Sequence, residues 1–280
     1  WKITPKTALF ADYSKTWRAP VIDEQYEVQA LGNRTASAVN LDPERMTGWR
    51  AGNITTFDRI FSKNDKALIR TTLFRNKVDD EIFKATGVGC AAQQTVGGMG
   101  DECAGLLPMA NYRNIGSLTI KGFEVESFYD STYLFGSLSY SWMTGTHEGA
   151  YTNPWGPNVW ARDIPAPKWV AVLGVKIPDW DARIGWQGEF VRKTDRLPSD
   201  KYAGGPASSV GDTFYDHYAN DAYNVQSVFA NWTPQQRYLK GTEVNFTVDN
   251  LFNTSYRPML SGLNAYSPGR NAKISVTRFF

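Results

Sequence analysis

Long hydrophobic runs are missing from this sequence of 280 residues. Its apolar stretches are only a few residues long, far short of the ~18 residues that a membrane-spanning helix needs. Any insertion into a membrane must therefore use β-strands. The net charge is +2 and no basic run is interleaved with aromatic residues, so nucleic acid is excluded as a partner. No positively charged segment followed by an apolar one comes after Trp1, and we expect a signal peptide to have been removed or to lie outside this piece.

The residue groups that zinc binding or catalysis requires are also lacking. The only two cysteines, Cys90 and Cys103, have no nearby Cys or His partner with which to form a zinc site. The Gly-x-Ser-x-Gly motif of serine hydrolases is absent. Carboxylate pairs such as Glu124 and Glu126 stand two residues apart, and we expect them to form hydrogen bonds with basic residues or with a part of the protein outside this chain. The sequence therefore indicates that the protein is not an enzyme.

Aromatic residues, in contrast, are abundant. They make up 14% of the chain, with 10 Trp and 14 Tyr, yet the mean hydropathy is -0.41 and 21% of the residues are charged. A soluble all-β protein and a transmembrane barrel both fit these values, because the lumen and the loops of a barrel are polar. Tyr and Trp also suit the interface between membrane and water. The layout of the strands has to decide between the two classes.

Alternation of apolar and polar residues with a period of two predicts ten β-strands, and no segment keeps a helical period of 3.6. The strands are expected near residues 6–18, 46–61, 66–84, 112–128, 132–146, 165–178, 181–195, 217–233, 240–252 and 270–280. We interpret residues 1–3 as the tail of an eleventh strand.

The connections between these strands are alternately short and long. The short ones are residues 62–65, 129–131, 178–180 and 234–239, and the long ones are residues 19–45, 85–111, 147–164, 196–216 and 253–269. In bacterial β-barrels all short connections lie at the periplasmic rim and all long ones at the extracellular rim. The strands also exceed the ~5–6 residues typical of globular sheets, and they can cross a bilayer at a tilt. The sequence therefore predicts an all-β fold, an antiparallel up-and-down transmembrane β-barrel.

The same period predicts which face of a strand meets lipid. Large apolar side chains share one face of three strands, while Ser, Gly or charged residues occupy the other: Leu134, Leu138, Tyr140 and Trp142 against Ser137, Ser139 and Ser141; Ile184, Trp186 and Phe190 against Arg183, Gln187 and Glu189; Phe123 and Val125 against Gly122, Glu124 and Glu126. An Arg or Lys on the lipid face at mid-membrane costs ~2–4 kcal/mol, so the charged faces must line a wet lumen.

The C-terminal end of the chain resembles that of a known family. Asn250-Leu-Phe-Asn253 is followed by Tyr256 and by a final strand that ends on Phe280. These elements are similar to the C-terminal box of the TonB-dependent outer-membrane receptors, which import scarce nutrients such as ferric siderophores and haem. The resemblance implies a location in the bacterial outer membrane and makes Phe280 the assembly signal. Arg278 stands where this family usually has an aromatic residue.

Members of this family have a 22-stranded barrel that is filled by a plug domain. Nothing in residues 1–280 resembles a plug, so we expect the chain to be the C-terminal part of such a barrel, with the plug domain elsewhere. A small, complete ten-stranded barrel is the alternative. The resemblance further implies contact with outer-membrane lipid, with the remainder of the barrel, and with the TonB complex through the plug.

Three further segments resemble haem receptors within this family. Trp17-Arg-Ala-Pro20 is similar to their Phe-Arg-Ala-Pro box, and Leu41-Asp-Pro-Glu44 is similar to the Leu-x-Pro-Glu element that opens their next strand. The Pro268-Gly-Arg-Asn271 entry to the last strand is also like theirs. Pro20 would end its strand by removing a ladder donor, and Arg18 can brace carboxylates at the rim. These boxes favour the haem and haemophore receptor branch.

Haem recognition needs an axial donor, usually an imidazole or a phenolate, and aromatic walls around the macrocycle. Haem receptors commonly carry a His between the two boxes, where this chain has Tyr26 instead. Both histidines of the chain lie on the extracellular side of the strand layout. The candidate ligand-binding residues are His217, His147, Tyr26, Tyr215, Tyr218 and Trp155, with His217 and His147 as candidate metal ligands. His217 ranks first because aromatic residues flank it.

Three functions remain open for such a barrel. A receptor that binds haem or a haem-carrying protein and imports haem with TonB energy is favoured, with haem as a transported ligand and not a permanently bound cofactor. A ferric-siderophore receptor of the same family is the alternative, and a passive porin-like channel is the third. Cys90 and Cys103 lie in one Gly-rich loop with twelve residues between them, and we expect them to form a disulfide in the oxidising periplasm.

Overall fold

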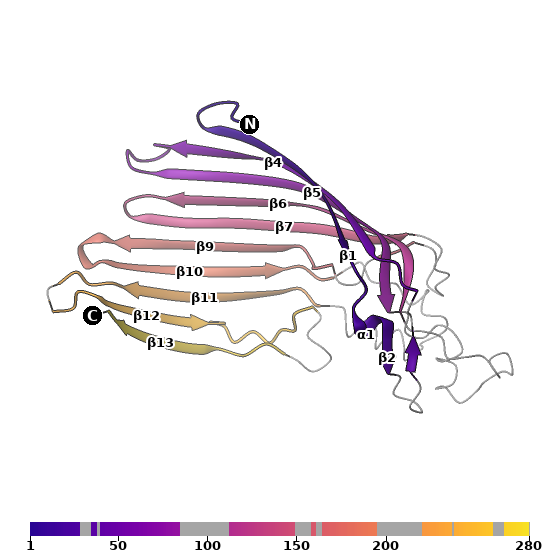
Figure 1. Cartoon of the computed structure of the whole chain (residues 1–280). Coiled ribbons are helices and arrows are strands. Elements are labelled where there is room, and N and C mark those ends of the chain that lie inside the picture. The colour runs from indigo at the N-terminus through magenta and orange to yellow at the C-terminus, as the bar shows by residue number, and fades with distance from the viewer. Residues whose placement is uncertain are drawn as a thin grey trace.

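The computed structural model describes residues 1–28, 35–37, 40–84, 112–148, 158–160, 164–194, 220–236, 238–259 and 266–279. Within these residues the strands form one large antiparallel sheet in the order β1-β4-β5-β6-β7-β9-β10-β11-β12-β13. A short strand, β8, pairs with the end of β7, and β2 and β3 form a separate hairpin. The large sheet is a single curved layer (Figure 1).

The ten strands of the large sheet match the ten that the sequence predicts. They are Thr7–Arg18 (β1), Glu44–Asp58 (β4), Lys66–Lys84 (β5), Tyr112–Asp130 (β6), Leu134–Glu148 (β7), Lys168–Ile177 (β9), Ala182–Val191 (β10), Tyr223–Trp232 (β11), Thr242–Asp249 (β12) and Asn271–Arg278 (β13). The smaller elements are helix α1 (Ile22–Gln25), β2 (Tyr26–Val28), β3 (Thr35–Ser37), β8 (Asn158–Trp160) and the 3-10 turn η2 (Pro178–Trp180). The prediction of an antiparallel all-β fold is confirmed. None of the helices in the described residues is long and apolar enough to cross a membrane.

The first three residues pair with the beginning of β1. Trp1 and Leu9 exchange two backbone hydrogen bonds, with N···O distances of 2.6 Å and 2.8 Å, and a bridge between Lys2 and Ala8 continues the pairing. This antiparallel pairing is what the tail of a further strand would make, as the sequence predicts.

Short turns join the strands at one rim of the sheet, and the long connections lie at the other rim (Figure 1). In the turn between β4 and β5 the carboxylate of Asp65 accepts hydrogen bonds from the backbone N–H groups of Ile60, Phe61 and Ser62. These bonds close the turn and end β4 at Asp58, three residues earlier than the sequence predicts. Asp65 is only 1% exposed, so the turn is built around this side chain.

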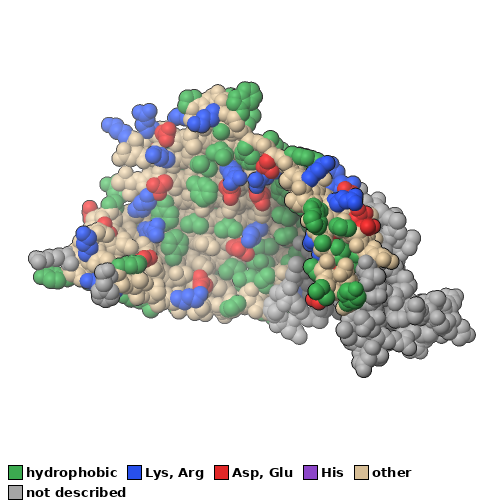
Figure 2. Space-filling view, in the orientation of Figure 1, with side chains coloured by type: hydrophobic (Ala, Val, Ile, Leu, Met, Phe, Trp, Pro, Cys, Tyr) green, Lys and Arg blue, Asp and Glu red, His purple; other side chains and the backbone are tan. Residues whose placement is uncertain are grey.

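The cross-strand register sorts the side chains of the sheet onto two faces, because residues directly opposite each other share a face. We call the face with most of the ion pairs the inner face and the opposite one the outer face. The ion pairs of the inner face include Asp12–Arg50, Arg70–Glu126, Lys168–Glu189, Lys176–Asp130 and Lys273–Asp249. Exposed apolar side chains occupy the outer face, among them Leu73, Leu138, Leu173, Ile184, Phe246 and Ile274. Figure 2 shows basic and acidic side chains gathered in the hollow of the sheet, and the predicted sorting of faces is confirmed.

A conventional apolar core is missing from the described part of the chain, where Ile82 and Ala166 are the only buried hydrophobic residues. The large apolar side chains instead remain exposed on the outer face. In water this face would be an apolar patch far larger than soluble monomers expose, whereas in a bilayer lipid covers it. The outer face is therefore the surface of the sheet that contacts membrane lipid.

Phenylalanine rings on the inner face lie across glycines of the neighbouring strand. The directly opposite pairs are Phe10 with Gly52, Phe74 with Gly122, Phe135 with Gly174, and Phe229 with Gly185. A Cβ atom added at Gly174 would stand 2.2 Å from the Phe135 Cζ atom. The absence of a side chain at these glycines makes room for the rings, which cover the exposed backbone of the inner wall.

Candidate ligand-binding rim

Aromatic residues form two bands on the sheet, one near each rim. Near the long connections, Tyr13 lies directly opposite Trp49 on the outer face, and the ring centroids of Tyr140 and Trp169 are 4.2 Å apart. The short turns each carry one exposed aromatic residue, namely Phe61, Tyr133, Trp180 and Tyr238. Trp and Tyr side chains settle at membrane interfaces because one end of each is apolar and the other is polar.

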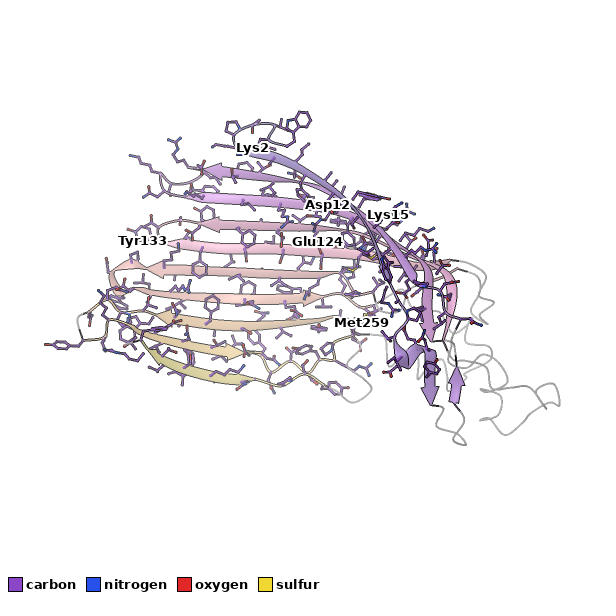
Figure 3. All side chains as sticks on the ribbon, in the orientation of Figure 1. Lys2, Asp12, Lys15, Glu124, Tyr133 and Met259 are labelled. Atoms are coloured by element: carbon purple, nitrogen blue, oxygen red, sulfur yellow. The ribbon has the colours of Figure 1, made fainter. Side chains whose placement is uncertain are left out.

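The separation of the bands agrees with the thickness of a membrane. Tyr133 lies at the short-turn end of β7 (Figure 3), and Trp142 stands nine residues further along that strand. At ~3.3 Å per residue these positions are ~30 Å apart along the strand, or ~23 Å along the membrane normal at a tilt of ~40°. An outer apolar band is typically ~25 Å tall. The end of β1 at Arg18, beyond the upper band, therefore lies outside the membrane.

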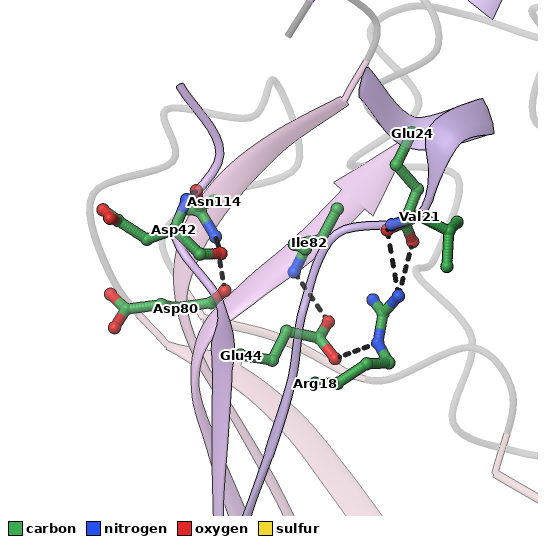
Figure 4. A network of polar contacts seen from close by, with 8 residues as sticks. All are labelled: Arg18, Val21, Glu24, Asp42, Glu44, Asp80, Ile82 and Asn114. Carbon is green, nitrogen blue, oxygen red and sulfur yellow. Dashed lines mark hydrogen bonds and ion pairs between the residues drawn. The ribbon is translucent and has the colours of Figure 1, made fainter. Parts of the chain in front are cut away.

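Arg18 stands at the base of the connection between β1 and β4 and binds two carboxylates (Figure 4). Its Nε atom donates a hydrogen bond to Glu44 Oε2 at 2.7 Å, and its Nη1 atom donates to both carboxylate oxygens of Glu24 at 2.9 Å. The backbone N–H of Val21 also donates to Glu24, at 2.9 Å. Arg18 therefore ties the last residue of β1 to the helix α1 and to the first residue of β4. We call Arg18, Glu24 and Glu44 the rim clamp.

The end of the connection that enters β4 is fixed to the sheet by two further groups of hydrogen bonds. Glu44 Oε1 accepts a hydrogen bond from the backbone N–H of Ile82 in β5 at 2.8 Å. Two residues before Glu44, the backbone of Asp42 exchanges hydrogen bonds of 2.7 Å and 2.8 Å with the Asn114 side chain, which also donates to the carbonyl of Asp80. Asp80 has a φ of 58°, and the pairing of β5 with β6 is interrupted at this residue without a change of register.

The electrostatics of the clamp favour its charged form. Burial alone would raise the pKa of Glu44, but hydrogen bonds from Arg18 and from the Ile82 N–H outweigh burial and hold this pKa below its usual value. The carboxylates of Glu44 and Glu24, which accept its hydrogen bonds, raise the pKa of Arg18. Arg18 and Glu44 therefore stay charged near neutral pH, and the guanidinium already donates hydrogen bonds to two carboxylates.

Tyr26 is the predicted ligand residue whose side chain the structure places. It follows helix α1 directly, begins β2, and lies opposite Ser37 of β3. Its side chain is 52% exposed, so the phenol is open to a ligand from the outside. Glu24 stands two residues before it, which places Tyr26 on the segment that the rim clamp holds.

The other predicted site residues are placed only in part. His147 lies in β7, with its backbone opposite Leu118 of β6 and Val159 of β8, and its side chain is outside the described residues. His217, Tyr215, Tyr218 and Trp155, as well as Cys90, Cys103 and Phe280, lie outside the described residues too. Their roles and the disulfide stay predictions. Within the described part of the chain no group of His, Cys, Asp and Glu residues is arranged to hold a metal ion.

The sequence predicted that Arg18 binds carboxylates at the rim, but it did not predict which ones. Glu44 was visible in the Leu-Asp-Pro-Glu element, and its position at a strand start opposite Arg18 could have suggested the pair. Glu24 and Asn114 carry no signal of that kind, because their contacts depend on how the connection folds back over the rim.

Comparison with known proteins agrees with this architecture. Residues 1–251 match the family model described as TonB dependent receptor-like, beta-barrel. TonB-dependent heme receptor A of Haemophilus ducreyi is 42% identical over the whole chain, and the protein of the same name in Haemophilus influenzae is 40% identical. Heme/hemopexin utilization protein C of Haemophilus influenzae is 25% identical. The chain spans 35% to 37% of the length of these relatives.

Solved structures share the fold at lower identity. The FrpB iron transporter of Neisseria meningitidis superposes with a TM-score of 0.67 at 19% identity, covering 99% of this chain and 37% of that one. The haemophore receptor HasR of Serratia marcescens, in complex with its haemophore HasA and heme, gives a TM-score of 0.62 at 17% identity, with 99% and 38% coverage. Strands, membrane-facing surface and relatives agree on a bacterial outer-membrane protein, and the chain belongs to the TonB-dependent receptor family as part of its β-barrel.

Proposed function

We propose that the receptor containing this chain binds haem, or a haem-carrying protein, at the extracellular rim of the barrel and imports haem with energy supplied through TonB. The observation that carries the proposal is the 42% identity, over the entire chain, to a relative named TonB-dependent heme receptor A. The region that would meet the ligand first is the long-connection rim, because long loops of bacterial barrels are extracellular.

The chemistry of the rim supports this ligand. Haem iron takes an imidazole or a phenolate as axial donor, and Tyr26 presents an exposed phenol on a segment that is fixed to the barrel. His217 and His147 are the candidate imidazole donors, and Tyr215, Tyr218 and Trp155 are the candidate walls for the macrocycle. Haem is then a transported ligand that must be released, so no resident cofactor and no catalytic group are required.

Transport requires parts that this chain shares with the rest of the protein. The inner face, with its ion pairs, would line the lumen, and a plug domain elsewhere in the receptor would close it and contact TonB. The proposal therefore assigns this chain the extracellular capture site and one wall of the passage. We propose no enzymatic activity for this chain.

Haem binding by the full-length receptor tests the proposal. Addition of haem should give a shifted Soret band, and His217→Ala, His147→Ala or Tyr26→Phe should shift it again and weaken binding where the replaced residue is the axial donor. Growth on haem as the sole iron source should fall in parallel. If all three variants leave the spectrum and growth on haem unchanged while a ferric siderophore supports uptake, the receptor carries siderophores instead.

A further inference from the structure

In the described part of the sheet, the Lys and Arg residues of the outer face gather near one rim on four neighbouring strands, apart from Arg278 at the end of β13. Five cations lie there, close to the long connections: Lys15 of β1, Arg45 of β4, Arg75 and Lys77 of β5, and Lys121 of β6. We call them the outer cationic patch. Figure 3 labels Lys15, which stands three residues along β1 from the inner-face residue Asp12.

The register places these cations in three adjacent rows. Arg75 lies directly opposite Lys121. The next row contains Lys15 and Lys77, on the two strands that flank β4, and Arg45 belongs to the third row. Strands are ~4.8 Å apart, and residues on one face of a strand are ~6.6 Å apart, so the patch measures ~15 by ~13 Å. That area fits one lipid headgroup.

The protein neutralises the patch only in part. Asp79 and Glu148 are the acidic residues that the register places in these three rows, and the Asp79 carboxylate lies 2.6 Å from Lys77 Nζ. Five basic residues against two acidic ones leave an excess of three positive charges in the described rows, and Lys15, Arg45 and Arg75 are all exposed. On the inner face, five cations of the described sheet form ion pairs with carboxylates, namely Arg50, Arg70, Lys168, Lys176 and Lys273.

The level of the patch matches the headgroup region of the extracellular leaflet. Arg75 shares its row with Trp49 and Tyr13 of the upper aromatic band, and apolar residues such as Leu73 follow toward the middle of the membrane. The outer faces of β7 and β9 to β13 have no Lys or Arg apart from Arg278, which lies at the short-turn end. Cations at the interface attract anionic lipid, whereas deeper in the bilayer they would be costly.

We propose that the outer cationic patch binds the phosphate groups of an anionic lipid in the extracellular leaflet of the outer membrane. Arg45 and Arg75 would donate paired hydrogen bonds to phosphate oxygens, and the three lysines would add compact charges around them. The acyl chains would lie along the apolar outer face below. This site is independent of the haem site, because it faces lipid and not the loops.

Native mass spectrometry of the delipidated full-length receptor in detergent tests the proposal, with bisphosphorylated lipid A as the probe. The variant Arg75→Gln/Lys77→Gln/Lys121→Gln should bind lipid A about a hundredfold more weakly, since each Lys or Arg near an anionic lipid surface strengthens binding by about fivefold. The affinity of the single variant Arg75→Gln for lipid A should fall about fivefold. A matched control, Lys2→Gln/Lys63→Gln/Lys240→Gln, removes three exposed lysines near the short-turn rim and should leave the affinity unchanged.

Two further arms decide the source of the phosphate. Lipid A without its phosphates should bind wild type and variants equally weakly, and millimolar inorganic phosphate should not displace the intact lipid. Equal lipid A affinity for wild type and the triple variant would overturn the proposal, as would equal binding of the dephosphorylated lipid or displacement by free phosphate. A heat-modifiable band on gels, the same for all variants, shows that each barrel is folded.

Discussion

Replacing Arg18 by glutamine should loosen the segment that carries Tyr26 without harming the barrel. The substitution keeps a polar side chain but shortens it and removes the charge that holds Glu24 and Glu44. Glu44 would still accept the Ile82 N–H, and Glu24 would still accept the Val21 N–H, so neither carboxylate is left without a partner. The strand pairing between β1 and β4 does not depend on this side chain.

The size of the effect follows from the exposure of the clamp. The Arg18 side chain is 43% exposed, whereas those of Glu24 and Glu44 are 13% and 16% exposed. A fully exposed ion pair contributes ~0.2–1 kcal/mol, and hydrogen bonds to charged groups in less accessible places contribute ~1.5–3 kcal/mol. For a clamp between these limits we expect a loss of ~1.5 kcal/mol, which corresponds to about a tenfold change in the local opening equilibrium.

Hydrogen exchange measured by mass spectrometry on the full-length receptor reads this opening directly. Peptides that contain Val21 and Tyr26 should exchange about tenfold faster in Arg18→Gln, while peptides from β9 and β10 stay unchanged. Lys15→Gln is the matched control, because it removes a cation from the outer face of the same strand. Unchanged exchange in Arg18→Gln would refute the idea that the clamp orders this segment.

A comparison of haem with haem dimethyl ester shows whether Arg18 acts by positioning the segment of Tyr26 or by contacting haem directly. The guanidinium is already occupied by two carboxylates, so we expect it to act through the segment and not by binding haem propionates. Arg18→Gln should then weaken the binding of haem and the binding of its dimethyl ester by the same factor. A loss of affinity for haem but not for the dimethyl ester would show that Arg18 contacts the propionates. That result would contradict the geometry of the clamp.

Acid should release the clamp by protonating Glu44. Because the folded-state pKa of Glu44 is lowered, its stabilising contribution is present above the ordinary value of ~4.3 and is lost as the pH falls through the lowered pKa. The difference in thermal midpoint between wild type and Glu44→Gln should therefore stay constant from about pH 7 to about pH 5 and shrink below about pH 4. A difference that grew on acidification would contradict this sign.

Two other substitutions test the faces of the sheet. Gly174→Val should drive the Phe135 ring off the inner wall and destabilise the barrel by ~1–3 kcal/mol, and Phe135→Leu in the same chain should restore part of the loss, as measured by heat-modifiability. Val276→Arg puts a charge on the lipid face at a cost of ~2–4 kcal/mol and should reduce outer-membrane yield, as should loss of Phe280, whereas Lys273→Ser should not. Equal yields for these variants would refute the assignment of faces.

The strands were predictable from the sequence because one physical rule governs each of them. A residue on the outer face must be apolar and a residue on the inner face can be polar, so a period of two survives along every strand. The alternation of short and long connections then fixed the up-and-down order. The period of two and the lengths of the connections can both be read along the sequence. Neither depends on which residues pair across neighbouring strands.

The details of the rim could not be predicted in the same way. Helix α1 has four residues, too few to show a helical period, and the β2–β3 hairpin has only three residues on each side. The rim clamp joins residues that are 6 and 26 positions apart, and their approach depends on the fold of the connection. Contacts of this kind follow from tertiary structure, not from spacing.

The direction of the sheet in the membrane follows from the length of its connections, and the outer cationic patch agrees with it. Long connections at one rim indicate the extracellular side, because periplasmic turns in bacterial barrels are short. The outer cationic patch lies at that rim as well, although nothing in the length of a loop requires charges on the lipid-facing strands below it. A sheet inserted the other way round would place the patch in the periplasmic leaflet and the rim clamp in the periplasm. The orientation with the long connections outside therefore places the patch in the extracellular leaflet and Tyr26 on the extracellular side.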